Sequence, residues 1–232
     1  MNKDKYFLIV PASGVGARMG SSVPKQYLKL ENGLTIIDQS LKTLLDINLI
    51  SGFIVSLSRT DSFFKSSSFF NHSKLLETVE GGKERFNSVL NALNSLNEYA
   101  QPNDWVLVHD SVRPCTKKSD IEKLIREVSN DSVGGILATR AIDTVKEKNE
   151  TGPISTIDRK KLYMAQTPQM FRFGILKEAI GSTIKLDKKI TDESEAIEKL
   201  GHSVKIIDGS SSNIKITSKA DIDLANYFLK KL

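Results

Sequence analysis

The chain has 232 residues, of which 39% are hydrophobic and 26% charged, an ordinary balance for a globular protein with a sizeable core. This length suits one α/β domain, so we expect a single domain over residues 1–232. No apolar run approaches the roughly 20 residues of a membrane helix. The apolar stretch at residues 6–10 is too short for a signal peptide, so we expect a cytoplasmic protein without membrane contact.

Charge and cysteine content limit the class of ligand further. There are 33 Lys and Arg residues against 28 Asp and Glu, a formal net charge of +5 that suits nucleic acid or a triphosphate. The cations are scattered, and no recognition helix or basic-aromatic stretch is present. A non-catalytic nucleic-acid-binding protein is therefore supported by net charge alone. The single cysteine, Cys115, excludes an internal disulfide and a thiolate metal cage.

Apolar patterns along the chain predict strands that alternate with helices. Short apolar runs predict strands at residues 6–10, 53–57, 105–108, 135–138, 204–207 and 214–216. Helical spacing predicts helices over 34–45, 86–96, 119–128, 192–200 and 218–229, the third opened by a capping box at Ser119 and the fourth ended by Gly201. Such alternation predicts an α/β fold with a mostly parallel twisted sheet and helices on both faces.

Residues 140–156 interrupt this alternation. The segment is polar and contains a Gly152-Pro153 turn. This polar pattern is compatible with either a solvated hairpin or a projecting arm. From the residues alone, the hairpin is favoured.

A glycine-rich loop follows the first predicted strand. Its glycines, Gly14, Gly16 and Gly20, can present backbone N–H groups to anionic oxygens at the carboxyl end of a strand. The spacing matches neither the dinucleotide fingerprint nor the P-loop. Arg18 and Lys25 add two cations suited to a triphosphate. The alternative is a plain turn with two solvated cations.

Two further segments carry candidate ligand contacts. Gly81 and Gly82 could admit a flat base close to the backbone, with the Ser88 hydroxyl near its edge, although a flexible turn fits equally. Asp110 ends a predicted buried strand, where a carboxylate is well placed for Mg²⁺, and Arg113 can stabilise phosphate charge. His109 beside them is expected to be a packed histidine rather than a base.

Taken together, ordered motifs cover nearly the whole chain: PASGVGARMG with PKQYL, GGKER, VHDSVRP, IDT with DR and QTPQ, TDE, and NIKIT. The set resembles the 2-C-methyl-D-erythritol 4-phosphate cytidylyltransferase family of the non-mevalonate isoprenoid pathway. The resemblance implies a Rossmann-like nucleotidyltransferase domain, a homodimer, Mg²⁺, and transfer of CMP from CTP to methylerythritol phosphate with release of pyrophosphate. It also implies that residues 140–156 form a dimer arm. Ribitol-5-phosphate cytidylyltransferase is the alternative, because it shares the loop and the CTP chemistry.

The resemblance also implies roles for individual residues. Catalysis is expected from Arg18, Lys25 and Lys215. CTP is expected at Ala12, Ser13, Gly14, Gly16, Gly82, Lys83, Ser88 and Asp110, and Asp110 is the candidate Mg²⁺ ligand. The acceptor is expected at Arg113, Thr144, Arg159 and Thr167.

Three positions depart from the family pattern. Ser13 stands where alanine is usual, and Lys83 stands where the base-site motif commonly has aspartate. The usual His-Asp-Ala-Ala-Arg-Pro reads His-Asp-Ser-Val-Arg-Pro. Lys83 therefore bears on CTP affinity and base selection if the acid side chain matters in the family.

Because a phosphate monoester is already anionic, we expect direct in-line attack without a general base, with catalysis by positioning and charge.

Overall fold

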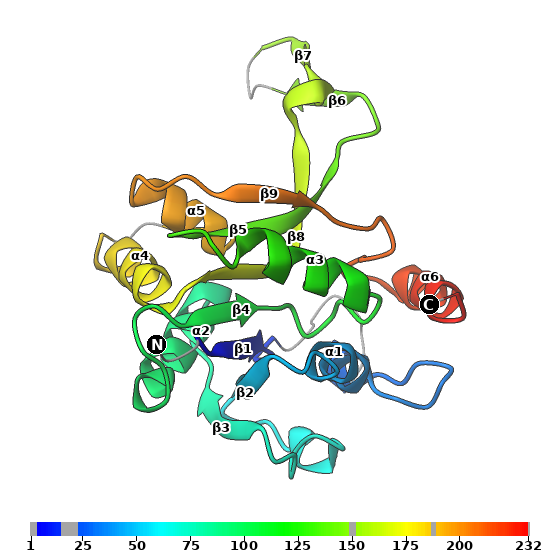
Figure 1. The fold of residues 1–232 in the computed structure, drawn as a ribbon. Coiled ribbons are helices and arrows are strands. Elements are labelled where there is room, and N and C mark those ends of the chain that lie inside the picture. The colour runs from blue at the N-terminus through cyan, green and yellow to red at the C-terminus, as the bar shows by residue number, and fades with distance from the viewer. Residues whose placement is uncertain (1–3, 15–22, 149–151, 187–188, 232) are drawn as a thin grey trace.

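A computed structural model describes residues 4–14, 23–148, 152–186 and 189–231. Seven strands form one sheet in the order β3-β2-β1-β4-β8-β5-β9, and β6 and β7 form a separate ribbon (Figure 1). The strands are β1 (Tyr6–Pro11), β2 (Ile50–Leu57), β3 (Leu75–Glu80), β4 (Trp105–Val108), β5 (Gly134–Arg140), β6 (Val145–Lys148), β7 (Ile154–Ile157), β8 (Tyr163–Arg172) and β9 (Lys205–Asp208). The helices are α1 (Ile36–Leu45), α2 (Arg85–Ser95), α3 (Lys118–Val128), α4 (Phe173–Lys185), α5 (Glu193–Lys199) and α6 (Lys219–Leu229).

The sheet is mostly parallel, as the sequence predicts. Strands β3, β2, β1 and β4 pair in parallel, and so do β5 and β9. Strand β8 runs antiparallel to both β4 and β5 and joins the two parallel groups. The carboxyl ends of β1 and β4 therefore lie at the same edge, because neighbouring parallel strands point the same way.

Two apolar layers enclose the sheet because alternate side chains of each strand point to opposite faces. Leu8 and Val10 of β1 belong to a core with α1 and α3. Phe7 and Ile9 belong to a second core with α2, α4 and α5. In a third hydrophobic cluster, α6 packs against the segment before α1 and against the residues that follow β4. The sheet is thus covered on both faces, and β1 and β4 are rigidly held.

Local details confirm some predicted boundaries and correct others. Ser218 caps α6 through a capping box, and Gly201, with φ +91°, follows the end of α5. The predicted capping box at Ser119 is wrong, because α3 begins at Lys118 with Lys117 at its N-cap and no side-chain cap. The predicted strand at residues 214–216 is also wrong: this segment forms no ladder and instead joins Ile216 N–H to the Val112 carbonyl.

The ribbon of β6 and β7 projects away from the body of the molecule (Figure 1). The two strands pair antiparallel, with Val145 opposite Ile157 and Lys148 opposite Ile154. Residues 141–144 connect β5 to the ribbon, and residues 158–162 connect the ribbon to β8. The polar segment is therefore both a hairpin and a projecting arm.

Candidate active site

A cavity of about 310 Å³ opens at the carboxyl ends of β1, β3 and β4. This is the edge where open α/β sheets bind ligands. Its wall comes from five separate stretches of chain. The lining residues are Pro11, Ser13, Gly14, Lys25, Gln26, Gly82, Lys83, Glu84, Arg85, Asp110, Ser111, Val112 and Lys215.

Asp110 is the centre of charge in this cavity. It follows β4 and is only 6% exposed. Its Oδ1 atom pairs with Arg85 Nε at 2.9 Å, and its Oδ2 atom pairs with Lys215 Nζ at 3.0 Å and Arg113 Nε at 3.2 Å. Burial opposes ionisation, but these three cations hold the pKa of the Asp110 carboxyl far below its usual range. Asp110 is therefore an anion that gathers one cation from α2, one from the loop after β4 and one from the segment before α6.

Thr167 and His109 support Asp110 from behind. The Asp110 backbone N–H donates to Thr167 Oγ1 at 3.1 Å, and Thr167 Oγ1 lies 3.1 Å from His109 Nδ1. Burial lowers the pKa of His109 to about 4, so the ring is neutral near pH 7. With Nε2 beside the Arg113 carbonyl at 3.3 Å, His109 is a packed histidine, as predicted.

The expected base end of the cavity holds a group of small residues. Ser13 Oγ lies 2.9 Å from Ser88 Oγ, and the Gly82 N–H donates to Ser88 Oγ at 3.0 Å. Ser88 is fully buried, so Ser13 stands between it and the open space. A Cβ on Gly81 would lie 2.3 Å from Ser13 Cβ, so this close approach requires glycine.

The two lysines predicted to be catalytic line the same cavity although they are far apart in sequence. Lys25 and Lys215 both line the cavity, and Lys25 Nζ donates to the Ile216 carbonyl at 3.2 Å. Gln26 beside Lys25 donates to the Ala12 carbonyl at 2.7 Å, which ties this segment to the end of β1. Lys83 is exposed at the cavity wall. Two cations from distant parts of the sequence thus line the same cavity.

The remaining predicted residues lie elsewhere. Thr144 and Arg159 are exposed on the projecting arm, where Arg159 donates to the Ile142 carbonyl, and they do not line the cavity. Arg18 and Gly16 lie outside the described residues. Within one chain, the structure therefore gathers the pocket residues but not the arm residues.

Sequence reasoning gave no role to Arg85 or Glu193, which form a short ion pair beside the cavity. Arg85 Nη1 donates to Glu193 Oε1 at 2.6 Å while its Nε holds Asp110. Both residues fall within the GGKER and TDE motifs, but a pairing across 108 positions has no local pattern that reveals it.

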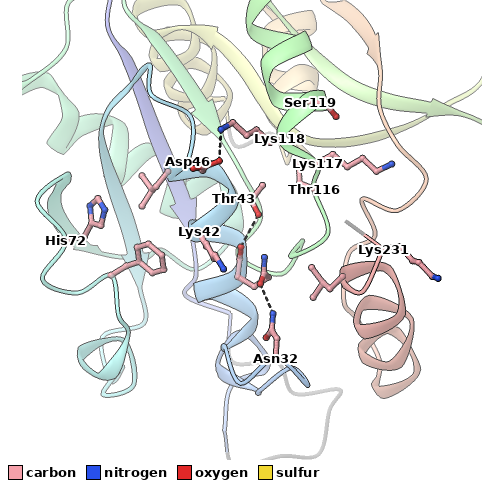
Figure 2. A pocket seen from close by; sticks show the side chains of 14 residues that line it. Asn32, Lys42, Thr43, Asp46, His72, Thr116, Lys117, Lys118, Ser119 and Lys231 are labelled. Carbon is pink, nitrogen blue, oxygen red and sulfur yellow. Dashed lines mark hydrogen bonds and ion pairs between the residues drawn. The ribbon is translucent and has the colours of Figure 1, made fainter.

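A larger cavity of about 860 Å³ lies between α1, the start of α3 and the end of α6 (Figure 2). Lys118 is paired with Asp46 at 2.6 Å, and Lys117 and Lys231 point to the side away from Lys42 (Figure 2). Its lysines do not converge, and it holds none of the predicted site residues. The smaller cavity at the strand ends is therefore the candidate active site.

A mostly parallel sheet with a cationic pocket at its strand ends is typical of an α/β protein that binds an anionic ligand. The likeness of the fold to solved cytidylyltransferase structures makes it nucleotidyltransferase-like. The family model "IspD: 2-C-methyl-D-erythritol 4-phosphate cytidylyltransferase" matches residues 6–231. The chain belongs to this family.

Individual relatives agree with the family match. The chain is 50% identical over 232 residues to the 2-C-methyl-D-erythritol 4-phosphate cytidylyltransferase of Ruthia magnifica, covering 97% of each chain. It is 42% identical to that of Aliivibrio fischeri, over 97% of this chain and 93% of the relative. The crystal structure of the Francisella tularensis enzyme superposes with a TM-score of 0.83 at 37% identity, covering 97% of this chain and all of that one.

Proposed function

We propose that this protein transfers CMP from CTP to 2-C-methyl-D-erythritol 4-phosphate, forming 4-diphosphocytidyl-2-C-methyl-D-erythritol and pyrophosphate. The observation that carries the proposal is the cavity at the strand ends, where four cationic and two acidic side chains from separate segments line one space. A net positive pocket suits a triphosphate and a phosphate monoester bound together. The named relatives favour methylerythritol phosphate over ribitol 5-phosphate as the acceptor.

The chemistry needs little beyond positioning. A phosphate oxygen of the acceptor attacks the α-phosphorus of CTP, the bond from that phosphorus to the α–β bridging oxygen breaks, and pyrophosphate leaves. Lys25 and Lys215 line the cavity. We propose that these two lysines and Arg18 stabilise the crowded negative charge. His109 is fully buried, does not line the cavity, and is a weak base because burial lowers its pKa to about 4. We therefore propose no role for it as a base, and an anionic acceptor needs none.

We propose that CTP reaches the cavity with its base toward Gly82 and its phosphates toward the lysines. Ser13, Gly14 and the backbone after Ala12 border the first part of this path, with Ser88 buried behind Ser13. We propose that the segment of Gly16 borders the phosphates. Lys83 contributes a cation at the wall where the family commonly has an acid.

A divalent cation fits this site only if the protein and CTP both supply its ligands. Among the described residues, no group of three His, Cys, Asp or Glu side chains could hold a metal. Asp110 accepts three ion-pair contacts through about four lone-pair sites, which leaves room for one more bond. We propose that Asp110 and the phosphates of CTP hold Mg²⁺, which would supply positive charge to the phosphates.

We further propose that the protein is a cytoplasmic homodimer whose arm completes the partner's pocket. The structure has no helix long and apolar enough to cross a membrane among the described residues. The arm and its base expose Ile142 (78%), Ile154 (64%) and Met164 (61%), an apolar set that favours burial against another protein surface. Arm contact would bring Thr144 and Arg159 to an acceptor that also meets Arg113 and Thr167. Sedimentation of wild type and Ile142→Ser tests this, with a shift toward monomer expected in the variant.

The decisive assay for the reaction is pyrophosphate release from CTP with each acceptor in the presence of Mg²⁺. We expect release that depends on methylerythritol phosphate, with the cytidylyl product confirmed by ³¹P NMR. Ribitol 5-phosphate and an acceptor-free sample serve as comparisons. Faster release with ribitol 5-phosphate would overturn the acceptor, and salt-sensitive RNA binding without any release would overturn the activity.

A further inference from the structure

The Arg85 guanidinium joins two carboxylates that belong to different elements. Arg85 is the first residue of α2, Asp110 follows β4, and Glu193 is the first residue of α5. Nε donates to Asp110 Oδ1 at 2.9 Å and Nη1 donates to Glu193 Oε1 at 2.6 Å. These lengths are typical of charge-assisted hydrogen bonds. One side chain therefore links the cavity to a helix behind it.

Glu193 lies out of reach of the cavity. It is 1% exposed and does not line the cavity. Burial raises its pKa, although the Arg85 charge acts in the opposite direction. Glu193 Oε2 and Arg85 Nη2 are buried without a hydrogen-bond partner in the part of the chain that the structure describes. A buried ion pair with unsatisfied atoms adds little stability over an apolar pair, so packing alone does not explain these residues.

The contact with Arg85 restrains the orientation of the Asp110 carboxylate. Arg85 holds Oδ1, while Oδ2 accepts from Lys215 at 3.0 Å and from Arg113 at 3.2 Å. Lys215 is 41% exposed and has a flexible side chain, so its contact with Asp110 restrains its ammonium at the cavity wall. A rotation of the Asp110 carboxylate would move this cation relative to the bound phosphates.

We propose that Glu193 and Arg85 are positioning residues for CMP transfer. Glu193 holds the guanidinium, the guanidinium orients Asp110, and Asp110 places the Lys215 ammonium. Neither Glu193 nor its contact with Arg85 touches substrate. The proposal rests on the proposed function, since its readout is the transfer rate.

The first test is Glu193→Gln, which keeps the shape and removes the charge. We expect kcat to fall about tenfold, the effect of weakening one charge-assisted hydrogen bond, while KM for CTP changes less than about threefold. Glu195→Gln is the matched control, because Glu195 lies on the same helix and pairs with Lys199 at 2.7 Å outside the cavity. It should retain wild-type kcat.

A double-mutant cycle with Arg85→Lys separates positioning from unrelated damage. A lysine cannot reach both carboxylates with a planar fork, so Arg85→Lys should lower kcat at least as much as Glu193→Gln. Once Arg85→Lys is present, adding Glu193→Gln should cost less than about twofold more, because the two residues act as one unit.

Three results would overturn the positioning role: wild-type kcat in Glu193→Gln, losses that multiply in the double variant, or a loss matched by the fraction of unfolded protein in a thermal melt. A wild-type protein with no acceptor-dependent release would instead refute the proposed function. The two failures are therefore distinguishable.

Discussion

Asp110 in the pocket and Arg159 on the arm are both expected at the active site, yet the fold supports them very differently. Asp110 is 6% exposed, follows a buried strand and makes three ion pairs. Arg159 is exposed, and its hydrogen bond to Ile142 stays within the arm. The pocket is therefore preorganised by one chain, whereas no contact among the described residues of that chain directs the arm toward the cavity. This contrast favours a site completed by two subunits.

The largest expected effect comes from disrupting the preorganised side. Asp110→Asn removes the anion that gathers Arg85, Arg113 and Lys215, so the three cations would repel one another around a neutral amide. We expect kcat/KM to fall about 10²- to 10³-fold, comparable to the loss of an oxyanion-hole donor. Steady-state kinetics with circular dichroism as a folding check measures this. Asp46→Asn, which breaks the exposed pair with Lys118 at the larger cavity, should leave kcat/KM unchanged.

The arm side can be tested by mixing subunits. Arg159→Ala alone should lower kcat/KM about tenfold or more, since one charged hydrogen bond to the acceptor phosphate is lost. Mixed with Asp110→Asn protein, it should regain about a quarter of wild-type activity, because half the dimers would be mixed and each would hold one intact site. A mixture of Asp110→Asn with Lys215→Ala should regain nothing. Equal activity in both mixtures would contradict an arm that serves the partner.

Acid should destabilise the fold through His109, which is buried behind the pocket. The pKa of His109 is lowered to about 4 in the fold, against about 6.5 in the unfolded chain. As the pH falls from about 6.5 to 4, His109 therefore becomes protonated in the unfolded chain but stays neutral in the folded chain. We expect the free energy of unfolding to drop by about 2 kcal/mol between pH 8 and pH 5 from this group. Below pH 4 the depressed pKa of Asp110 should add a further loss.

Urea titrations at each pH measure this slope. His109→Gln should flatten it between pH 6.5 and 5, and the exposed His202→Gln should not. An unchanged slope in His109→Gln would show that His109 titrates normally.

The smallest effect is expected at the base end. A Cβ at Gly81 would overlap Ser13, so Gly81→Ala should push Ser13 into the cavity and raise KM for CTP about fivefold. Gly181→Ala in α4 is the control, because its Cβ would meet nothing within 4 Å and alanine favours helix by about 1 kcal/mol. A KM in Gly81→Ala equal to that of Gly181→Ala would mean that Ser13 does not border the bound nucleotide.

Much of this fold could be predicted because its strands are short buried apolar runs and its helices have one apolar face. Trp105–Val108 and the helix capped by Ser218 are examples in which local pattern and structure agree. The pattern at residues 214–216 predicts a strand, but the Ile216 N–H donates to the Val112 carbonyl after β4 and the Ile214 N–H to the Ser212 carbonyl, so no ladder forms. The apolar residues of this segment pack against α6. Their spacing therefore reflects burial against a helix rather than pairing in a sheet.

Pairings across the sequence limited what could be predicted of the site. Lys25 and Lys215 were identified by their motifs, and the structure brings both to one cavity. Glu193 was missed because its partner is 108 positions away and because a glutamate after a helix cap is ordinary. Arg18 lies outside the described residues, so its place beside the lysines stays a prediction.

The most direct measurement is the single-turnover rate of CMP transfer by Lys25→Ala at saturating CTP, methylerythritol phosphate and Mg²⁺. If cations from separate segments stabilise the charge that develops at the α-phosphorus, this rate should fall about 10²- to 10³-fold while CTP still binds. A rate within about twofold of wild type would contradict the account, because the pocket would then transfer CMP without the cation best placed to assist.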